Sequence, residues 1–252
     1  MSLTVGYFAD PHVGSDELNC KTRRPAMSAG KMRELMGIFA ARQADIVICL
    51  GDLIDGRHGP GEARRDAAGA AEIMKESCLP FFCLPGNHDL AELTHREFFD
   101  AAGIRRPPFS YEKEGVTFVF LDACFSDDGT PEGRAYFSDG EHPDWTNSYV
   151  PRSQTEKLKD LLIRGGEEDR FVILSHQSLD PGCEPRHVVR NAGEIRGIID
   201  GYGSGRVIEV VCGHYHRGRE AAVGGVPYVN LPALCDGESI PPGACRIKHY
   251  KV

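Results

Sequence analysis

The sequence predicts an α/β fold in which two β-sheets pack face to face with helices on the outside. In the first half of the chain, short apolar runs alternate with helical segments, which is typical of parallel strands joined by helices. In the second half, pairs of apolar runs are joined by short polar turns, which indicates hairpins. The parallel half and the hairpin-rich half therefore predict two sheets within one domain, residues 1–252.

The first half contains three predicted strands and three predicted helices. Each strand is a short apolar run bounded by polar residues; the strands cover residues 3–8, 46–50 and 79–84. The helices are Ala-rich or carry apolar residues at helical spacing; they cover residues 27–42, 64–77 and 94–101. Thr94 and Glu97 form a capping-box pattern at the start of the last helix.

The second half begins with a hairpin, residues 107–111 and 116–121 around the turn 112–115. The Gly224-Gly225 pair predicts a second hairpin. Its strands and the other strands expected here cover residues 220–223, 226–231, 171–174, 207–212 and 244–250. Two further helices are expected, at 153–163, where Ser153 and Glu156 form a capping-box pattern, and at 188–200. The polar segment 126–150 has no strand pattern, and its length predicts a lid or a substrate-facing excursion.

Composition limits the class of protein. With 41% apolar and 26% charged residues, the chain is typical of a globular domain. A formal charge of −8 argues against a general nucleic-acid or membrane-surface binder, and no apolar run is long enough to span a bilayer. The nine cysteines form no Cys-x-x-Cys pair, and the first predicted strand leaves no room for a signal peptide, so we expect reduced thiols and a cytoplasmic location.

Five polar motifs each follow an apolar run. They are Asp10-Pro11-His12, Gly51-Asp52-Leu53-Ile54-Asp55, Gly86-Asn87-His88-Asp89, Ser175-His176 and Gly213-His214-Tyr215-His216. Open α/β sheets carry their chemistry at the carboxyl ends of the strands, so these side chains are expected to meet there. Carboxylate, amide and imidazole groups suit two divalent metal ions that clamp a phosphate. In an extended backbone, the spacing of two would turn Asp10 and His12 to the same side.

The order of the five motifs and the residues in each resemble those of the calcineurin-like metallophosphoesterases. The resemblance implies a four-layer αββα sandwich, two mixed β-sheets flanked by helices, and a centre of two divalent metal ions. The expected ligands of the first ion are Asp10, His12, Asp52 and His216. The expected ligands of the second ion are Asp52 as a bridge, Asn87, His176 and His214. His88 is expected to donate a proton to the leaving oxygen or to stabilise the phosphoryl charge, with Asp55 orienting its ring.

Three further stretches resemble the manganese-dependent ADP-ribose/CDP-alcohol diphosphatase branch of this superfamily. They are residues 50–56, 191–198 and 225–231. The protein-phosphatase branch fits less well, because Gly56 follows Asp55 where that branch has arginine, and Arg57 is displaced by one. Manganese is therefore the expected metal, although mixed nitrogen and oxygen ligands also suit iron or zinc.

The expected function is hydrolysis, by metal-activated hydroxide, of a phosphodiester or pyrophosphate bond in a small nucleotide-like substrate. The alternatives are a phosphomonoesterase, a structure-selective nuclease and a non-catalytic scaffold of the same fold. No membrane and no general nucleic-acid partner is expected.

Several residues near the motifs have two interpretations. Arg57 and His58 follow Asp55 and either contact a substrate phosphate or belong to a solvated loop. His142 and Trp145 either line a base-binding face or anchor the excursion. Asp89 is expected to stabilise its own turn. The remaining histidines are expected on helices or at the surface; they are His95, His187 and His249.

Overall fold

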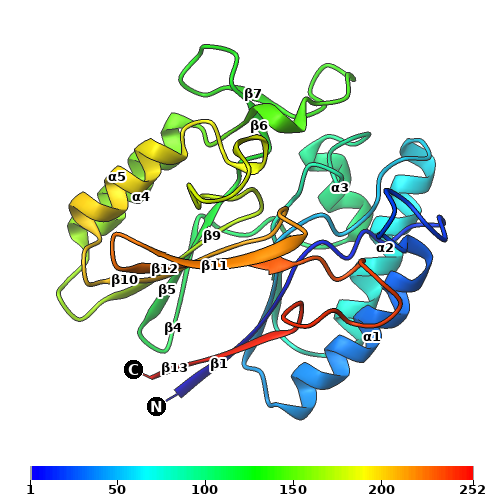
Figure 1. The fold of residues 1–252 in the computed structure, drawn as a ribbon, viewed down its shortest axis with the longest axis horizontal. Helices are drawn as coiled ribbons and strands as arrows, with labels where there is room; N and C mark the ends of the chain where they lie inside the picture. Colours follow the sequence, from blue (N-terminus) through cyan, green and yellow to red (C-terminus); the bar gives the residue numbers. More distant parts are fainter. Residues whose placement is uncertain (1, 252) are drawn as a thin grey trace.

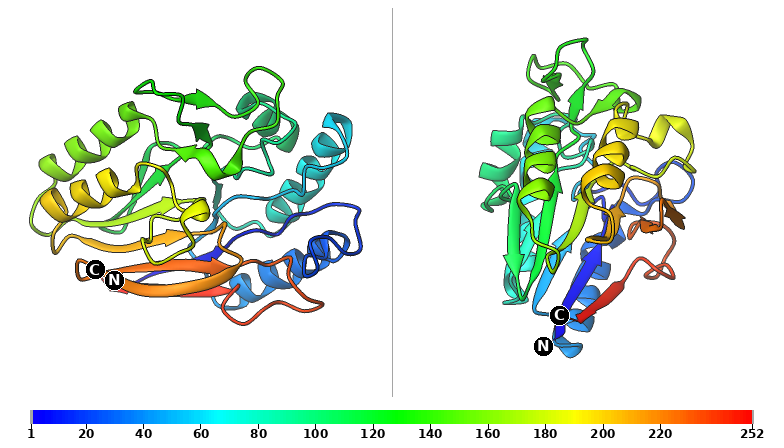
Figure 2. Two further views of the ribbon diagram at one scale, coloured as in Figure 1. Left: turned by 45° about the horizontal axis from the view of Figure 1, so that its top comes forward. Right: turned by 90° about the vertical axis from the view of Figure 1, so that its left-hand side faces the viewer.

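The chain folds into four layers, helices, sheet, sheet and helices, in the computed structural model, which describes residues 2–251 (Figure 1). Seen from the side, the two sheets lie next to each other with helices outside (Figure 2). The predicted α/β sandwich is therefore confirmed. No helix within the described residues is both long enough and apolar enough to cross a bilayer.

The first sheet has four strands in the order β13-β1-β2-β3. Its parallel strands are β1 (Ser2–Phe8), β2 (Ile46–Cys49) and β3 (Phe81–Cys83), and β13 (Arg246–Lys251) pairs antiparallel with β1. Its outer face is covered by α1 (Pro25–Ala41), α2 (Pro60–Glu76) and α3 (His95–Ala102). The predicted capping box of α3 is present, because Thr94 and Glu97 bond reciprocally. α2 begins four residues before the predicted start, because Pro60 is suited to a first helical turn.

The second sheet has six strands in the order β11-β12-β10-β9-β5-β4. In chain order its strands are β4 (Ser110–Lys113), β5 (Val116–Leu121), β9 (Arg170–Ser175), β10 (Val207–Cys212), β11 (Arg217–Val223) and β12 (Val226–Pro232). Both predicted hairpins form, as β4–β5 and β11–β12. The outer face of this sheet is covered by α4 (Arg152–Arg164) and α5 (Ala192–Tyr202).

Alternation along the strands fills the space between the two sheets. Leu3, Val5 and Tyr7 of β1 are fully buried in the core that the sheets share. Phe8 faces the helices instead, and Gly6 lets α1 approach closely, since a Cβ there would lie 2.7 Å from the Phe39 ring. β1 is thus buried on both faces, as expected of a central strand in a parallel sheet.

The starts of the last two helices differ from the predictions. The capping box expected at Ser153 and Glu156 is absent, because another group occupies the start of α4. The carboxylate of Glu132 accepts from the Ser153 backbone N–H at 3.1 Å and from its hydroxyl at 2.6 Å. α5 begins four residues later than predicted, because Val188 pairs with Ser178 as an isolated bridge.

The segment 126–150 carries more regular structure than the sequence indicated. It contributes to a three-stranded sheet of β6 (Phe125–Ser126), β7 (Arg134–Ala135) and β8 (Ser148–Tyr149), and it contains the short helix η1 (Trp145–Asn147). Strands of two residues are too short to produce a periodic pattern. This small sheet lies beyond the ends of the strands of the second sheet (Figure 1).

Candidate metal centre

The five motifs occupy the loops that follow β1, β2, β3, β9 and β10, and backbone hydrogen bonds join these loops to one another. Asp10 N–H donates to the Gly51 carbonyl at 3.0 Å, and His12 N–H donates to that of Asp52 at 2.9 Å. Within the second sheet, Gly213 N–H donates to the His176 carbonyl at 2.9 Å, and between the two sheets His214 N–H donates to the Asp10 carboxylate at 2.9 Å. Residues about two hundred positions apart in the chain are therefore held in one network.

The backbone of these loops is strained at the motif residues themselves. Asp10, His12, Asp52 and His214 all have φ between 47° and 65°, in the left-handed region that residues with a Cβ rarely adopt. The prediction of an extended backbone for residues 10–12 is therefore wrong. Asp10 and His12 nevertheless face the same point, because both turn out of the strand through left-handed residues. Such strain persists only where the surrounding structure holds it, and it concentrates at functional sites.

The first expected ligand group comes together around His12. Its Nε2 atom lies 3.4 Å from Asp52 Oδ2, 3.8 Å from Asp10 Oδ1 and 3.2 Å from His216 Nε2. His216 Nε2 also lies 3.6 Å from Asp10 Oδ1. Asp10 and His12 are fully buried, so these donors lie in a site with little water.

The second expected ligand group surrounds the same Asp52 carboxylate. His176 Nε2 lies 3.3 Å from Asp52 Oδ2 and 3.3 Å from Asn87 Oδ1, and a nitrogen of His214 completes the group within 4.8 Å. Asp52 Oδ1 accepts the His88 backbone N–H at 2.8 Å, which leaves Oδ2 between the two groups. The structure thus brings all seven expected ligands together, with Asp52 shared.

His88 and Asp55 are adjacent, but their contact differs from the expected one. His88 Nδ1 donates to the backbone carbonyl of Asp55 at 2.7 Å, whereas the Asp55 carboxylate lies 3.8 Å away. That carboxylate instead accepts from Asn19 at 3.0 Å and from Arg23 at 3.3 Å. Arg23 also donates to His88 Nε2 at 3.2 Å. Asp55 therefore positions His88 through its carbonyl and through Arg23.

The charges of this cluster favour the binding of a cation. Burial raises the pKa of Asp10, whereas the pKa of Asp52 is held well below its usual range because His176, His88 and His12 outweigh the effect of burial. Burial opposes protonation of His176, but Asp52 and Asp10 outweigh it and raise the pKa of His176 to about 10. A proton on His176 thus neutralises part of the charge that a metal ion would neutralise.

The donor set fits divalent ions. His214 is buried, its pKa is lowered by burial and by His176, and its Nε2 atom has no hydrogen-bond partner among the described residues. A neutral imidazole with a free ring nitrogen is the form that binds metal. His176 Nδ1 donates to the Leu50 carbonyl at 2.7 Å, which directs its Nε2 atom toward Asp52. Oxygen and imidazole donors of this kind suit manganese, iron and zinc.

Glycines allow the motif loops to pack this closely. A Cβ on Gly51, whose φ is 99°, would lie 2.7 Å from His176 Nδ1. A Cβ on Gly86 would collide with the backbone and the carboxylate of Asp52. Asp89 acts on its own turn as predicted, because its carboxylate accepts from Gly86 N–H at 2.8 Å and also joins the neighbouring loop at Ile54 N–H, 3.0 Å away.

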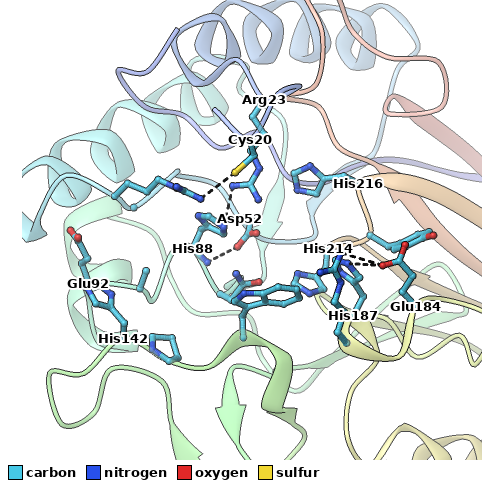
Figure 3. A pocket seen from close by; sticks show the side chains of 18 of the residues that line it. Cys20, Arg23, Asp52, His88, Glu92, His142, Glu184, His187, His214 and His216 are labelled. Atoms are coloured by element: carbon cyan, nitrogen blue, oxygen red, sulfur yellow. Dashed lines mark hydrogen bonds and ion pairs between the residues drawn. The ribbon is translucent and has the colours of Figure 1, made fainter. Parts of the chain in front are cut away.

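The metal groups lie at the floor of a cavity of about 590 Å³ (Figure 3). Arg23, Arg57, His142, Trp145 and His187 are among the residues that line it. No motif marked Arg23, which lies in a loop rich in polar residues. Arg57 lines the cavity and lies 3.5 Å from Asp55 Oδ2, whereas His58 pairs with Asp16 at the exposed surface.

The other histidines lie on helices or at the surface as predicted, but one of them also lines the cavity. His187 lies in the short helix η2 (Pro185–His187) and lines the cavity, with its ring 5.0 Å from that of His214. His95 begins α3 and pairs with Asp122 at 3.0 Å. His249 lies on the outermost strand β13 of the first sheet and bonds Thr4.

The four layers and the clustered acids and histidines define a metallophosphoesterase-type fold. The calcineurin-like phosphoesterase family matches residues 3–218, and the chain belongs to that family.

Three relatives illustrate the similarity. The 3′,5′-cyclic adenosine monophosphate phosphodiesterase CpdA of Haemophilus influenzae is 24% identical over 237 residues, 90% of this chain and 75% of its own length. The DNA double-strand break repair protein Mre11 of Sulfurisphaera tokodaii is 27% identical over 181 residues, 71% of this chain and 42% of its own. The crystal structure of a dimetal phosphatase from Danio rerio superposes with a TM-score of 0.76 at 19% identity, covering 93% of this chain and 88% of that one.

Proposed function

We propose that this protein hydrolyses a phosphodiester or pyrophosphate bond of a small nucleotide-like substrate at a centre of two divalent metal ions, with manganese as the first candidate. The observation that carries the proposal is the convergence of seven metal-type donors, six of them around the buried carboxylate of Asp52, at the floor of a cavity. A volume of about 590 Å³ suits a nucleotide-sized molecule.

The two donor groups would each hold one ion. Asp10, His12 and His216 would hold the first, Asn87, His176 and His214 the second, and Asp52 would contact both. Two ions in such a site supply charge neutralisation at the phosphoryl group and a nucleophile activated at neutral pH.

Two residues of the protein, His88 and Arg23, would protonate the leaving oxygen and stabilise the phosphoryl charge. His88 holds its Nδ1 proton against the Asp55 carbonyl, so Nε2 is the atom free to exchange a proton with substrate. Burial and Arg23 lower the pKa of His88, with Asp52 opposing them, so the ring is neutral until a phosphate arrives. The negative charge of the bound phosphate favours the protonated ring, so Nε2 would take up a proton from solvent and pass it to the leaving oxygen, while the Arg23 guanidinium beside it would stabilise the phosphoryl charge.

Small nucleotide-like substrates are supported by the cavity and by one relative. The relative from Haemophilus influenzae is a cyclic nucleotide phosphodiesterase. The formal charge of −8 argues against a nucleic-acid backbone as the general partner. More specifically, we propose hydrolysis of a diphosphate, as in the ADP-ribose/CDP-alcohol branch.

The ligand assignment is tested with protein reconstituted with manganese and assayed on bis-p-nitrophenyl phosphate. Asn87→Ala and His176→Ala should each lower turnover by orders of magnitude while circular dichroism shows an intact fold. His58→Ala is the matched control, since this histidine is exposed and lies outside the cavity lining. Turnover like that of wild type in both ligand variants would contradict the assignment.

The substrate class is tested by a screen over cyclic nucleotides, ADP-ribose, CDP-alcohols and simple monoesters, repeated with manganese, iron and zinc. We expect kcat/KM at least tenfold higher on a diester or diphosphate than on the monoesters. A preference for monoesters would establish the phosphomonoesterase alternative. Cleavage of oligonucleotides with higher efficiency than any mononucleotide would establish the nuclease alternative.

A further inference from the structure

One wall of the cavity is aromatic and begins directly beside the metal centre. The ring centroid of Trp145 lies 5.2 Å from that of His187 and 5.4 Å from that of His214. His187 in turn lies 5.4 Å from Tyr215. We call Trp145, His187 and Tyr215 the aromatic wall. His214 is one of the expected ligands, so the wall adjoins the position of the scissile phosphate.

The short helix that carries Trp145 is held by several anchors. The Asp144 carboxylate caps η1, accepting from the Thr146 backbone N–H at 3.0 Å and from its hydroxyl at 2.7 Å. Asn147 donates its side-chain amide to the Asp127 carbonyl at 3.0 Å, and the next residues form β8 of the small sheet. Trp145 is therefore positioned before any ligand arrives.

The helix that carries His187 is fixed from the opposite side. Ser178 N–H donates to the His187 carbonyl at 3.2 Å, and Val189 N–H returns a bond to Ser178 at 3.0 Å. Arg190 N–H then donates to the Ser148 carbonyl at 2.8 Å, which joins this segment to β8. The two halves of the aromatic wall thus come from segments about forty residues apart that are bonded to each other.

The charges around the aromatic wall cancel only in part, because one carboxylate faces two arginines. The Glu184 carboxylate lies 3.3 Å from Arg186 and 3.5 Å from Arg217, the two arginines on this side. Arg186 also lies over the Trp145 ring at 5.8 Å. Flat aromatic rings with a guanidinium nearby favour a planar ring that can stack on them.

The opposite side of the cavity has a different character. Glu92 and His142 lie there, with Asp52 and His88 between them and His187 (Figure 3). Glu92 is nearly buried, and its Oε2 atom has no hydrogen-bond partner among the described residues. This side therefore favours polar hydrogen-bond donors over a stacked ring.

We propose that the aromatic wall is the base-binding subsite of this enzyme, with the nucleobase stacked on Trp145 and His187. Because the wall adjoins His214, the base and the scissile phosphate belong to the same nucleotide, separated only by its sugar. The segment 126–150 thereby contributes a specificity residue, Trp145. This inference rests on the proposed function and narrows its substrate to molecules in which a nucleoside is attached directly to the phosphate that is attacked.

Trp145 is the only tryptophan in the chain, so its fluorescence reports on the subsite without any turnover. We expect AMP and CMP to quench this fluorescence saturably in the manganese-loaded protein, and ribose 5-phosphate, which has the same phosphate and sugar, to leave it nearly unchanged. Equal responses to AMP and to ribose 5-phosphate would overturn the inference. Quenching does not depend on catalysis, so an absence of hydrolytic activity would contradict the proposed function separately.

A kinetic ratio tests the same subsite. AMP and ribose 5-phosphate are compared as competitive inhibitors of bis-p-nitrophenyl phosphate turnover, and the ratio of their inhibition constants isolates the base. We expect AMP to bind about 10- to 100-fold more tightly than ribose 5-phosphate in wild type, as base–aromatic stacking allows. In Trp145→Ala the ratio should fall to below about threefold, and Trp145→Phe should restore part of it.

His142→Ala, on the opposite side of the cavity, is the matched control and should keep the wild-type ratio. A ratio that stays unchanged in Trp145→Ala, or one that collapses equally in His142→Ala, would overturn the assignment of the base to the aromatic wall. Neither result would bear on the metal ligands, which are tested by bis-p-nitrophenyl phosphate turnover itself.

Discussion

The floor and the wall of the cavity are built in different ways. The floor consists of the loops after β1, β2, β3, β9 and β10, and it depends on strained backbone and on glycines that admit no side chain. The wall consists of η1 and η2, and it depends on side chains such as those of Asp144 and Asn147 that cap and fasten irregular segments. A site whose floor is set by buried strand ends can keep its chemistry while an outer segment changes its substrate.

The largest expected difference between the two regions comes from matched glycine substitutions. Gly86→Ala should abolish activity and lower the free energy of unfolding by about 2–3 kcal/mol, because the new methyl group collides with the Asp52 backbone. In the excursion, a Cβ on Gly129 would have no neighbour within 4 Å. Gly129→Ala should therefore lower the free energy of unfolding only by the cost of its φ of 81°, about 1–2 kcal/mol, and should retain activity. Turnover and urea unfolding of both variants measure the difference; equal losses of activity would contradict it.

The floor should also give the metal-free protein a distinctive pH dependence. Asp52 and Asp10, acting against burial, raise the pKa of His176 to about 10. A raised folded-state pKa adds stability that is full below the unfolded value of about 6.5 and is lost as the pH rises through 10. A metal ion replaces this proton, so metal binding should release protons and strengthen as pH rises through the same range.

Thermal unfolding with and without manganese between pH 6 and pH 10 checks the first part of this prediction, and calorimetry in buffers of different ionisation enthalpy checks the second. The loaded protein should lack the loss of stability above about pH 6.5. A manganese affinity independent of pH over this range would contradict the role given to His176.

A smaller effect is expected where the excursion joins α5. The Asn191 side chain donates to the Val150 carbonyl at 2.9 Å and accepts the Val150 N–H at 3.1 Å, like a neighbouring strand. Asn191→Ala should lower the free energy of unfolding by about 1–2 kcal/mol and loosen the aromatic wall. Urea unfolding measures the loss, and a red shift of Trp145 emission measures the loosening. An unshifted emission spectrum would show that other contacts suffice to hold η1.

The smallest expected effect on stability distinguishes two groups at the start of α4: Glu156, which the sequence pattern indicated as a cap, and Glu132, which the structure shows bonded to Ser153. Glu132→Gln should cost about 1 kcal/mol, because its carboxylate accepts from Ser153 at the start of the helix. Glu156→Gln should cost less than about 0.5 kcal/mol, because Glu156 only pairs with Arg152 at the surface. Urea unfolding of both variants tests the order, and neither change should alter turnover. A larger loss of unfolding free energy in Glu156→Gln than in Glu132→Gln would support the capping box that the sequence predicted.

Most of the site floor was predictable from the sequence because its residues follow short apolar strands, and parallel strands that end at one sheet edge bring such residues together. The sequence did not reveal the left-handed backbone of Asp10 and His12, since that conformation is imposed by contacts with the loops after β2 and β10. Arg23 was missed for a similar reason. Its loop has no periodic pattern, and only folding places its guanidinium beside His88.

By itself, the sequence determined the layered α/β architecture, because that follows from local patterns of apolar strands and the polar residues that end them. The seven donors of the candidate metal centre were implied by the resemblance of its five motifs to those of the calcineurin-like metallophosphoesterases. Only the tertiary structure decided where Trp145 and His187 lie, what caps α4 and how His88 is oriented. Those features depend on single contacts between segments far apart in the chain, and no local pattern encodes such contacts.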